Sequence, residues 1–228
     1  MIRPLIAVKS CWRDSGNGFN QAVRDTWGKD VKGADVGFFL GRFGLAGRPF
    51  EIVLDCPDDY NGLPYKTKAI CKWVWNHDYT HLFACDTDTF VMPERLLNSG
   101  FENYDYVGHF NGPRGIPNVV YGKCYSWASG GSGYWLSRKA MEIVKDADPA
   151  KVSACPLTAI PCEDLWVGQV LGPLIATNDI IVSHDPRYGE GYDACNYKTE
   201  ITSHYRSQSA EREFDPEWMR RHYIANCL

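Results

Sequence analysis

Residues 80–88, with the sequence THLFACDTD, are the stretch that most directly predicts the fold. The first six residues of this stretch are typical of a buried β-strand, and they end directly on the triplet Asp86-Thr87-Asp88. Open α/β sheets bind ligands at the carboxyl ends of their strands, so the two carboxylates stand where such a sheet would place a site. The stretch therefore predicts an α/β sheet with a charged site at the end of one strand.

Strand-like and helical segments alternate on both sides of this stretch. We expect strands at residues 5–8, 36–40, 51–54, 104–110 and 180–182, helices at residues 20–27, 137–145 and 163–171, and further helices beginning at Pro64 and Asp215. In the helix that begins at Pro64, Ile70, Trp73, Val74 and His77 repeat at helical spacing and predict a face packed on the sheet. Residues 41–47, 111–122 and 147–161 are expected to be loops, and residues 186–197 are rich in Gly, Tyr and Asp. The alternation favours an α/β sandwich with a central, mostly parallel sheet.

The bulk composition limits the class of protein. The chain has 228 residues, of which 44% are hydrophobic and 14% aromatic, so we expect a single domain over residues 1–228. The 24 Lys and Arg residues against 28 Asp and Glu give a net charge of -4 without a basic stripe, so a nucleic-acid partner is not expected. The apolar stretch near the N-terminus is too short for a signal peptide or a membrane span. Nine cysteines without a C-x-x-C pair predict free thiols in a reducing compartment, and hence a cytoplasmic protein.

The acid triplet by itself allows more than one interpretation. Asp86 and Asp88 can converge on one hard divalent cation, but carboxylates at this spacing also cap helices or face solvent. Phosphatases with an aspartyl nucleophile need Thr or Val two residues after the second aspartate, where this chain has Phe90. The Gly- and Ser-rich residues 129–134 do not form a nucleophile elbow, because Tyr134 stands where a glycine is required. Neither kind of hydrolase is favoured.

Six motifs resemble, in the same order, those of glycosyltransferase family 31, the inverting β-1,3-galactosyl- and N-acetylglucosaminyltransferases with the related Fringe and core-1 enzymes. The motifs are residues 22–28 (AVRDTWG), 38–41 (FFLG), 58–67 (DDYNGLPYKT), 82–91 (LFACDTDTFV), 129–137 (SGGSGYWLS) and 163–168 (EDLWVG). A collinear series is far more specific than any one motif. In the fourth motif Thr87 stands where the family usually has a third acid, so only the outer two aspartates are retained.

The resemblance implies a GT-A fold and a metal-dependent, inverting transfer of a hexose, galactose-like, from a UDP-sugar to a hydroxyl of a glycan acceptor. Mn²⁺ or Mg²⁺ held by Asp86 and Asp88 would bridge to the donor diphosphate and neutralise the charge that develops on UDP. Inversion needs a base on the opposite side of the anomeric carbon, and the resemblance points to Asp164, with Glu163 as the alternative. Alternatively, Asp164 has only a structural role, as a carboxylate at a helix N-terminus that the helix dipole stabilises.

The resemblance extends to further donor-binding and metal-binding positions. The donor-binding positions are Arg24, Lys66, Asp86, Thr87, Asp88, Gly130, Gly131 and Gly133. Arg24 and Lys66 would bind the donor phosphates, but each is equally typical of an ordinary surface charge. The glycines would allow the backbone to approach a ligand closely or to form a tight turn. Related enzymes carry a late metal-binding histidine, for which His204 is the candidate and His184 its rival. Trp127 and Trp135 would stack on a sugar or belong to the core.

Two other functions are weighed against the transferase. A catalytically silent sugar- or nucleotide-binding module is disfavoured because the acids at 86, 88 and 164 are retained. A metal-dependent hydrolase is disfavoured by Phe90 and by the order of the motifs. The donor sugar and the acceptor depend on the shape of the pocket, and no oligomeric state is predicted. We expect a cytoplasmic enzyme of a bacterium, or of a large virus that builds its own glycans in the host cytoplasm.

Overall fold

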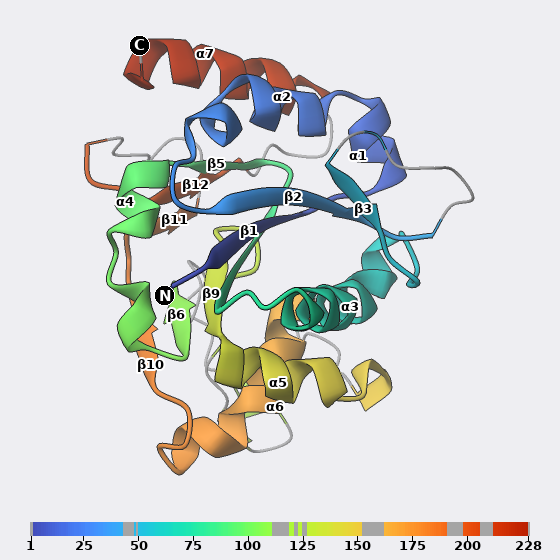
Figure 1. The fold of residues 1–228 in the computed structure, drawn as a ribbon, viewed down its shortest axis with the longest axis vertical. Coiled ribbons are helices and arrows are strands. Elements are labelled where there is room, and N and C mark those ends of the chain that lie inside the picture. Colours follow the sequence, from blue (N-terminus) through green and yellow to red (C-terminus); the bar gives the residue numbers. More distant parts are fainter. Residues whose placement is uncertain are drawn as a thin grey trace.

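The computed structural model describes residues 2–42, 48, 50–110, 119–120, 123–124, 127–151, 162–190, 198–205 and 212–227. Of the predicted loops, residues 43–47, 111–118, 121–122 and 152–161 lie outside this set, as do residues 191–197 of the segment rich in Gly, Tyr and Asp. The described part contains a central sheet, a small second sheet, a hairpin of β7 (Val119–Val120) and β8 (Lys123–Cys124), and helices on both faces of the central sheet (Figure 1).

The central sheet is mostly parallel, as the sequence predicts. Its seven strands lie in the order β10-β6-β9-β4-β1-β2-β3. In chain order they are β1 (Pro4–Lys9), β2 (Asp35–Leu40), β3 (Glu51–Val53), β4 (His81–Asp86), β6 (Tyr106–Gly108), β9 (Tyr134–Ser137) and β10 (Val182–His184). β9 is antiparallel to both of its neighbours, and every other pair in this sheet is parallel. β4 is the strand predicted before the acid triplet, and it ends on Asp86.

β1 explains why this sheet is the middle layer. All six of its residues are buried. Leu5 and Ala7 belong to one hydrophobic cluster, and Ile6 and Val8 belong to another, because successive side chains of a strand point to opposite faces. A strand that is buried on both faces requires a cover on each side.

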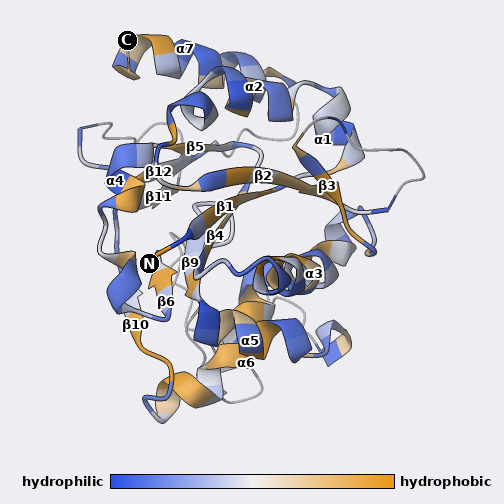
Figure 2. Ribbon diagram, in the orientation of Figure 1, coloured by the Kyte–Doolittle hydropathy of each residue, from blue (hydrophilic) through white to orange (hydrophobic). Residues whose placement is uncertain are grey.

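Helices supply both covers (Figure 1). One face carries α3 (Leu63–Asn76), α5 (Arg138–Asp146) and α6 (Glu163–Ala176), and the other carries α1 (Trp12–Gly16), α2 (Phe19–Asp25) and α7 (Asp215–Cys227). A short helix, α4 (Pro93–Leu97), follows the strand after the acid triplet. Short 3₁₀ turns are η1 (Trp27–Asp30), η2 (Tyr60–Gly62), η3 (Phe101–Asn103), η4 (Pro149–Lys151) and η5 (Arg212–Phe214). Hydrophobic residues gather in the central strands and in α6 (Figure 2). The predicted α/β sandwich is confirmed.

The second sheet connects the C-terminal part of the chain to the acid triplet. Its order is β11-β12-β5, formed by β11 (Tyr188–Glu190), β12 (Thr202–His204) and β5 (Thr89–Val91). β5 begins directly after Asp88, and β12 pairs with it antiparallel, so that His204 lies opposite Thr89. The sequence did not predict this sheet, because its three-residue strands are too short to show periodicity.

Several boundaries differ from the predictions. β9 was missed, because its four residues follow a glycine cluster that predicts a turn. The predicted strand at residues 180–182 is shifted to β10, so His184 lies within a strand. α6 continues past residue 171 to Ala176 although it contains Pro173. His77 is the exposed C-cap of α3 and stacks on Trp73 with 3.8 Å between ring centroids, so it is not part of the face packed on the sheet.

Two further features bear on the expectations from composition. The cysteines whose side chains the structure describes are all free thiols: Cys11, Cys56, Cys71, Cys85, Cys162 and Cys227. Within the described ranges, every helix is too short or too polar to cross a bilayer.

Candidate functional site

A cleft of about 1060 Å³ opens at the carboxyl ends of β1 and β4. The two strands are parallel neighbours, and their last residues, Lys9 and Asp86, lie side by side. The cleft is lined by the chain that follows β1, by residues around η2 and the start of α3, and by Asp86, Thr87 and Arg212. Its position is the one where open α/β sheets bind ligands.

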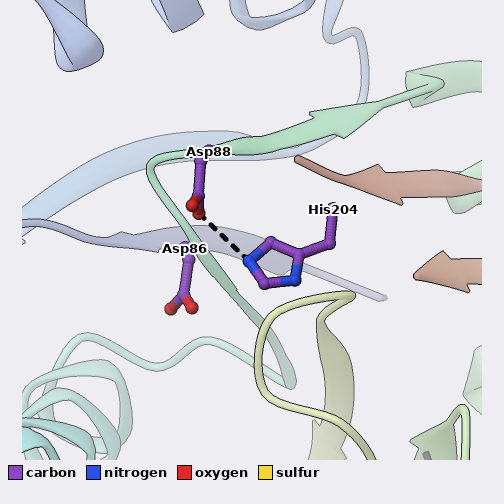
Figure 3. Close-up of side chains that lie close together, drawn as sticks. All are labelled: Asp86, Asp88 and His204. Carbon is purple, nitrogen blue, oxygen red and sulfur yellow. Dashed lines mark ion pairs between the residues drawn. The ribbon is translucent and has the colours of Figure 1, made fainter. Parts of the chain in front are cut away.

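Asp86, Asp88 and His204 come together beside this cleft (Figure 3). Each offers one ligand atom, and these atoms lie within 4.8 Å of one another. Nε2 of His204 is 3.3 Å from Oδ1 of Asp88. The pairing of β12 with β5 causes this arrangement, because the Tyr205 N–H donates to the Asp88 carbonyl (2.9 Å) and so anchors the histidine beside the triplet.

The donor set of this group fits a divalent cation. Carboxylate oxygens with one imidazole nitrogen are ligands that suit Mn²⁺, and the oxygens alone suit Mg²⁺. Asp88 is buried, and among the described residues its Oδ1 accepts no hydrogen bond. Burial would raise the pKa of Asp88, but His204 and Arg212 lower it below the usual range, so the carboxylate is kept ionised. Burial raises the pKa of Asp86, against the effect of Lys9.

Gly131 explains how the imidazole fits. A Cβ at this position would stand 2.2 Å from Cε1 of His204, so any side chain would displace the ring. Side chains at Gly130 and Gly133 would also clash with the protein. A Cβ at Gly130 would meet Oε2 of Glu163 at 2.8 Å. A Cβ at Gly133, where φ is +84°, would meet Cζ of Phe83 at 2.3 Å. The three glycines therefore make room for side chains of the site and the core.

Lys9 and Glu163 form a buried ionic network under the acid triplet. Nζ of Lys9 donates to Oε2 of Glu163 at 2.9 Å and lies 3.3 Å from Oδ1 of Asp86. Oε1 of Glu163 accepts from the Thr67 hydroxyl at 2.8 Å and from the Tyr134 hydroxyl. Burial would lower the pKa of Lys9, but Asp86 and Glu163 raise it above its ordinary value. Both oxygens of Glu163 are thus engaged inside the protein, which argues against Glu163 as the alternative base.

Asp164 is the half-buried neighbour of this network. Its Oδ2 accepts from the Gly130 N–H at 3.1 Å, and its Oδ1 accepts from the Leu165 N–H at 2.8 Å. Burial, together with the charge of Glu163, raises the pKa of Asp164 to about 6. Tyr60 lines the cleft, and burial and the nearby Cys162 raise its pKa. The charges of Asp164 and Asp86 raise the pKa of Tyr60 further. Asp164, Asp86 and Tyr60 therefore share one neighbourhood.

The other predicted positions separate into two groups. Lys66 lines the cleft, and its Nζ donates to Asp58 at 2.8 Å and to the Ser10 carbonyl. Thr87 also lines the cleft, and its hydroxyl donates to Asp14 at 2.9 Å. Arg24 is not among the residues that line the cleft; its guanidinium lies 4.3 Å from the Phe38 ring centre and 3.5 Å from Glu51.

The rival histidine and the two tryptophans lie elsewhere. Nδ1 of His184, on the edge strand β10, accepts from the Phe110 N–H at 3.1 Å, and β6 and β9 separate this strand from β4. Trp135 is buried and stacks on Phe101 at 3.8 Å, so it belongs to the core. Trp127 is half-buried.

Two cations at the site were missed by the sequence reasoning. Lys9 carries a visible signal, because it ends a strand whose other residues are apolar or Pro. Arg212 lies about 120 residues after the triplet, and its Nη2 is 3.6 Å from both Asp88 Oδ2 and Asp14 Oδ2. No local pattern around Arg212 predicts this placement.

The comparisons with known proteins identify the fold. No protein-family model matches the sequence, and the comparison with curated proteins found no match. A glycosyltransferase involved in the glycosylation of the major capsid of PBCV-1 is similar in structure, with a TM-score of 0.54 and 14% identity over 97% of this chain and 100% of that one. GlyE, a glycosyltransferase of Streptococcus pneumoniae TIGR4, has a TM-score of 0.51 and 10% identity over 100% of this chain and 64% of that one. The chain has the fold of these glycosyltransferases, whereas membership of family 31 stays a prediction.

Proposed function

We propose that the protein is a glycosyltransferase that moves a hexose from a UDP-sugar to a hydroxyl of a glycan acceptor, with Mn²⁺ or Mg²⁺ as cofactor. The observation that carries the proposal is the convergence of Asp86, Asp88 and His204, within 4.8 Å, beside a large cleft at the carboxyl ends of parallel strands. The fold, which is that of solved glycosyltransferases, supports the reaction class. The six motifs that resemble family 31 support the choice of UDP and of inversion.

Asp86, Asp88 and His204 would hold the metal. When bound, the ion would neutralise the negative charge that develops on the diphosphate as the bond to the sugar breaks. Lys66 and Thr87 line the same cleft and contribute to its donor side. Lys9 and Glu163 hold Asp86 and α6 in position through their buried ion pair, and Arg24, which is not among the residues that line the cleft, is left out of this proposal.

Asp164 would be the base. With a pKa of about 6, its carboxylate is ionised at neutral pH and still basic enough to accept a proton. The N–H groups of Gly130 and Leu165 hold it in one orientation. As the acceptor oxygen bonds to the anomeric carbon, its proton passes to Asp164 and the bond from that carbon to the UDP oxygen breaks. Attack from the face opposite to UDP inverts the anomeric configuration.

The test is release of UDP from a panel of UDP-sugars with Mn²⁺, measured with and without a mixture of glycan acceptors. We expect release that requires both acceptor and metal, that stops with EDTA, and that yields a β-linked product by NMR. Equal release without acceptor would indicate a hydrolase. Binding of UDP-sugars without release under any condition would indicate a silent binding module, and either result would overturn the proposal.

A further inference from the structure

Arg212 occupies an unusual position among the charges of the site. It lies on η5, at the cleft, and its side chain is 43% exposed, whereas those of Asp14 and Asp88 are only 8% and 6% exposed. Nη2 is 3.6 Å from one oxygen of each carboxylate. Both separations are longer than an ordinary N–H···O hydrogen bond. The guanidinium therefore neutralises two buried carboxylates without a close hydrogen bond to either.

At least one donor of Arg212 is uncommitted within the part of the chain that the structure describes. A guanidinium carries five N–H donors in a fixed fork. Among the described residues, Nε of Arg212 is buried and has no hydrogen-bond partner. Lys9, the other cation at the triplet, differs: its side chain is 1% exposed, and it donates to Glu163 at 2.9 Å. Lys9 is fixed, and Arg212 is free to take a better acceptor.

A divalent ion at the triplet would compete with Arg212. The ion would share Asp88 with a guanidinium that now lies 3.6 Å from the same carboxylate, and like charges at such separations repel strongly where water is scarce. A phosphate oxygen pair is the acceptor geometry that a guanidinium prefers. A diphosphate next to the ion would therefore offer Arg212 a new hydrogen-bond acceptor when the guanidinium moves away from Asp88.

We infer that Arg212 is a placeholder cation, which balances Asp88 and Asp14 before the metal binds and then transfers to the diphosphate of the donor. This inference rests on the proposed function and goes beyond it. It has a consequence that a plain phosphate-binding residue would not have. Removal of the Arg212 charge should strengthen metal binding and weaken nucleotide binding, so the two affinities change in opposite directions.

The test is calorimetric titration of Arg212→Met with Mn²⁺ alone, and with UDP at saturating Mn²⁺. We expect Mn²⁺ alone to bind about two- to fivefold more tightly than to the unaltered protein, the range of a partly exposed ion pair. We expect UDP to bind about tenfold more weakly, as for the loss of a hydrogen bond to a charged group. Arg212→Lys keeps the charge without the fork, so its Mn²⁺ affinity should stay unchanged while its UDP affinity still falls.

Arg221→Met is the matched control, because it removes the same charge from the exposed pair with Glu217 on α7. It should change neither affinity, and melting curves establish that each variant is folded. Weaker or equal Mn²⁺ binding by Arg212→Met, or unchanged UDP binding, would overturn the inference. Failure of the unaltered protein to bind Mn²⁺ would instead contradict the proposed function itself.

Discussion

The floor and the rim of the site are built in opposite ways. The floor consists of Lys9, Thr67, Tyr134 and Glu163, all buried, and both oxygens of its glutamate accept hydrogen bonds from the other members. The rim consists of Asp88, His204 and Arg212: Nε2 of His204 lies 3.3 Å from one oxygen of Asp88, and Nη2 of Arg212 lies 3.6 Å from the other. The polar groups of the floor thus bond to one another within the fold, whereas the rim gathers two carboxylate oxygens of Asp88, an imidazole and a guanidinium at longer separations. Substitutions on the two sides should fail in different ways.

The largest effect should come from Asp164, which directly follows the floor residue Glu163 in the chain and accepts from the Gly130 N–H. Asp164→Asn keeps the size of the side chain but cannot accept the proton of the acceptor, so kcat should fall by about 10² to 10⁴. Mn²⁺ and UDP should bind nearly as before, because the hydrogen bonds that Asp164 accepts within the described part of the chain come from the N–H groups of Gly130 and Leu165 and not from the triplet. Steady-state kinetics with parallel titrations check this split, and near-normal turnover would remove Asp164 from the role.

A floor substitution should act on stability first. Lys9→Met leaves Glu163 and Asp86 without their shared cation, and breaking a buried pair in this way costs about 3–5 kcal/mol in the free energy of unfolding. Urea denaturation measures the loss. The double substitution Lys9→Met with Glu163→Gln should recover part of it, because it removes the uncompensated charge. A Lys9→Met protein as stable as the original would show that the floor is not a structural ion network.

A rim substitution should act on metal binding with little loss of stability. In Gly131→Ala the new methyl group must displace the His204 ring, so we expect affinity for Mn²⁺ to fall about tenfold, the size of a disturbed ligand orientation. Gly16→Ala is the control for Mn²⁺ binding alone: Gly16 lines the cleft, but a Cβ there meets nothing within 4 Å, whereas one at Gly131 meets the His204 ring. Equal titration curves for both variants would mean that the ring position does not matter for the metal.

The smallest effect concerns pH. The pKa of Asp164 is about 6 in the folded protein against 3.8 for the ordinary value, so its ionised form opposes folding at neutral pH, and this cost disappears below about pH 4. Asp164→Asn should therefore raise the stability by about 1 kcal/mol at pH 7.5, after allowance for partial exposure, and by almost nothing at about pH 3. Melting temperatures across this range check the sign. A difference that is independent of pH would contradict the raised pKa.

The same contrast describes what the sequence could predict. β1, β4, α3 and the position of Asp86 followed from apolar runs, helical spacing and a strand that ends on acids, which are local patterns. The rim required β12 to pair with β5 across more than 100 residues, and three-residue strands carry no local signal. His204 was therefore predicted only through a resemblance, and Arg212 was missed. The ion network of the floor was missed as well, because Lys9 and Glu163 meet only once the sheet and α6 are assembled.

The most direct test of the central claim compares two histidines of the same chain. Titration with Mn²⁺ of His204→Ala and of His184→Ala, followed by UDP release at each metal concentration, asks whether the group of Asp86, Asp88 and His204 holds the catalytic ion. We expect His204→Ala to weaken Mn²⁺ binding by about tenfold or more and to shift the metal dependence of UDP release equally. His184→Ala should bind Mn²⁺ as the unaltered protein does, because His184 lies on β10, an edge strand of the central sheet, where its imidazole accepts from the Phe110 N–H. A loss at position 184 with none at position 204, or full activity in EDTA, would contradict the account.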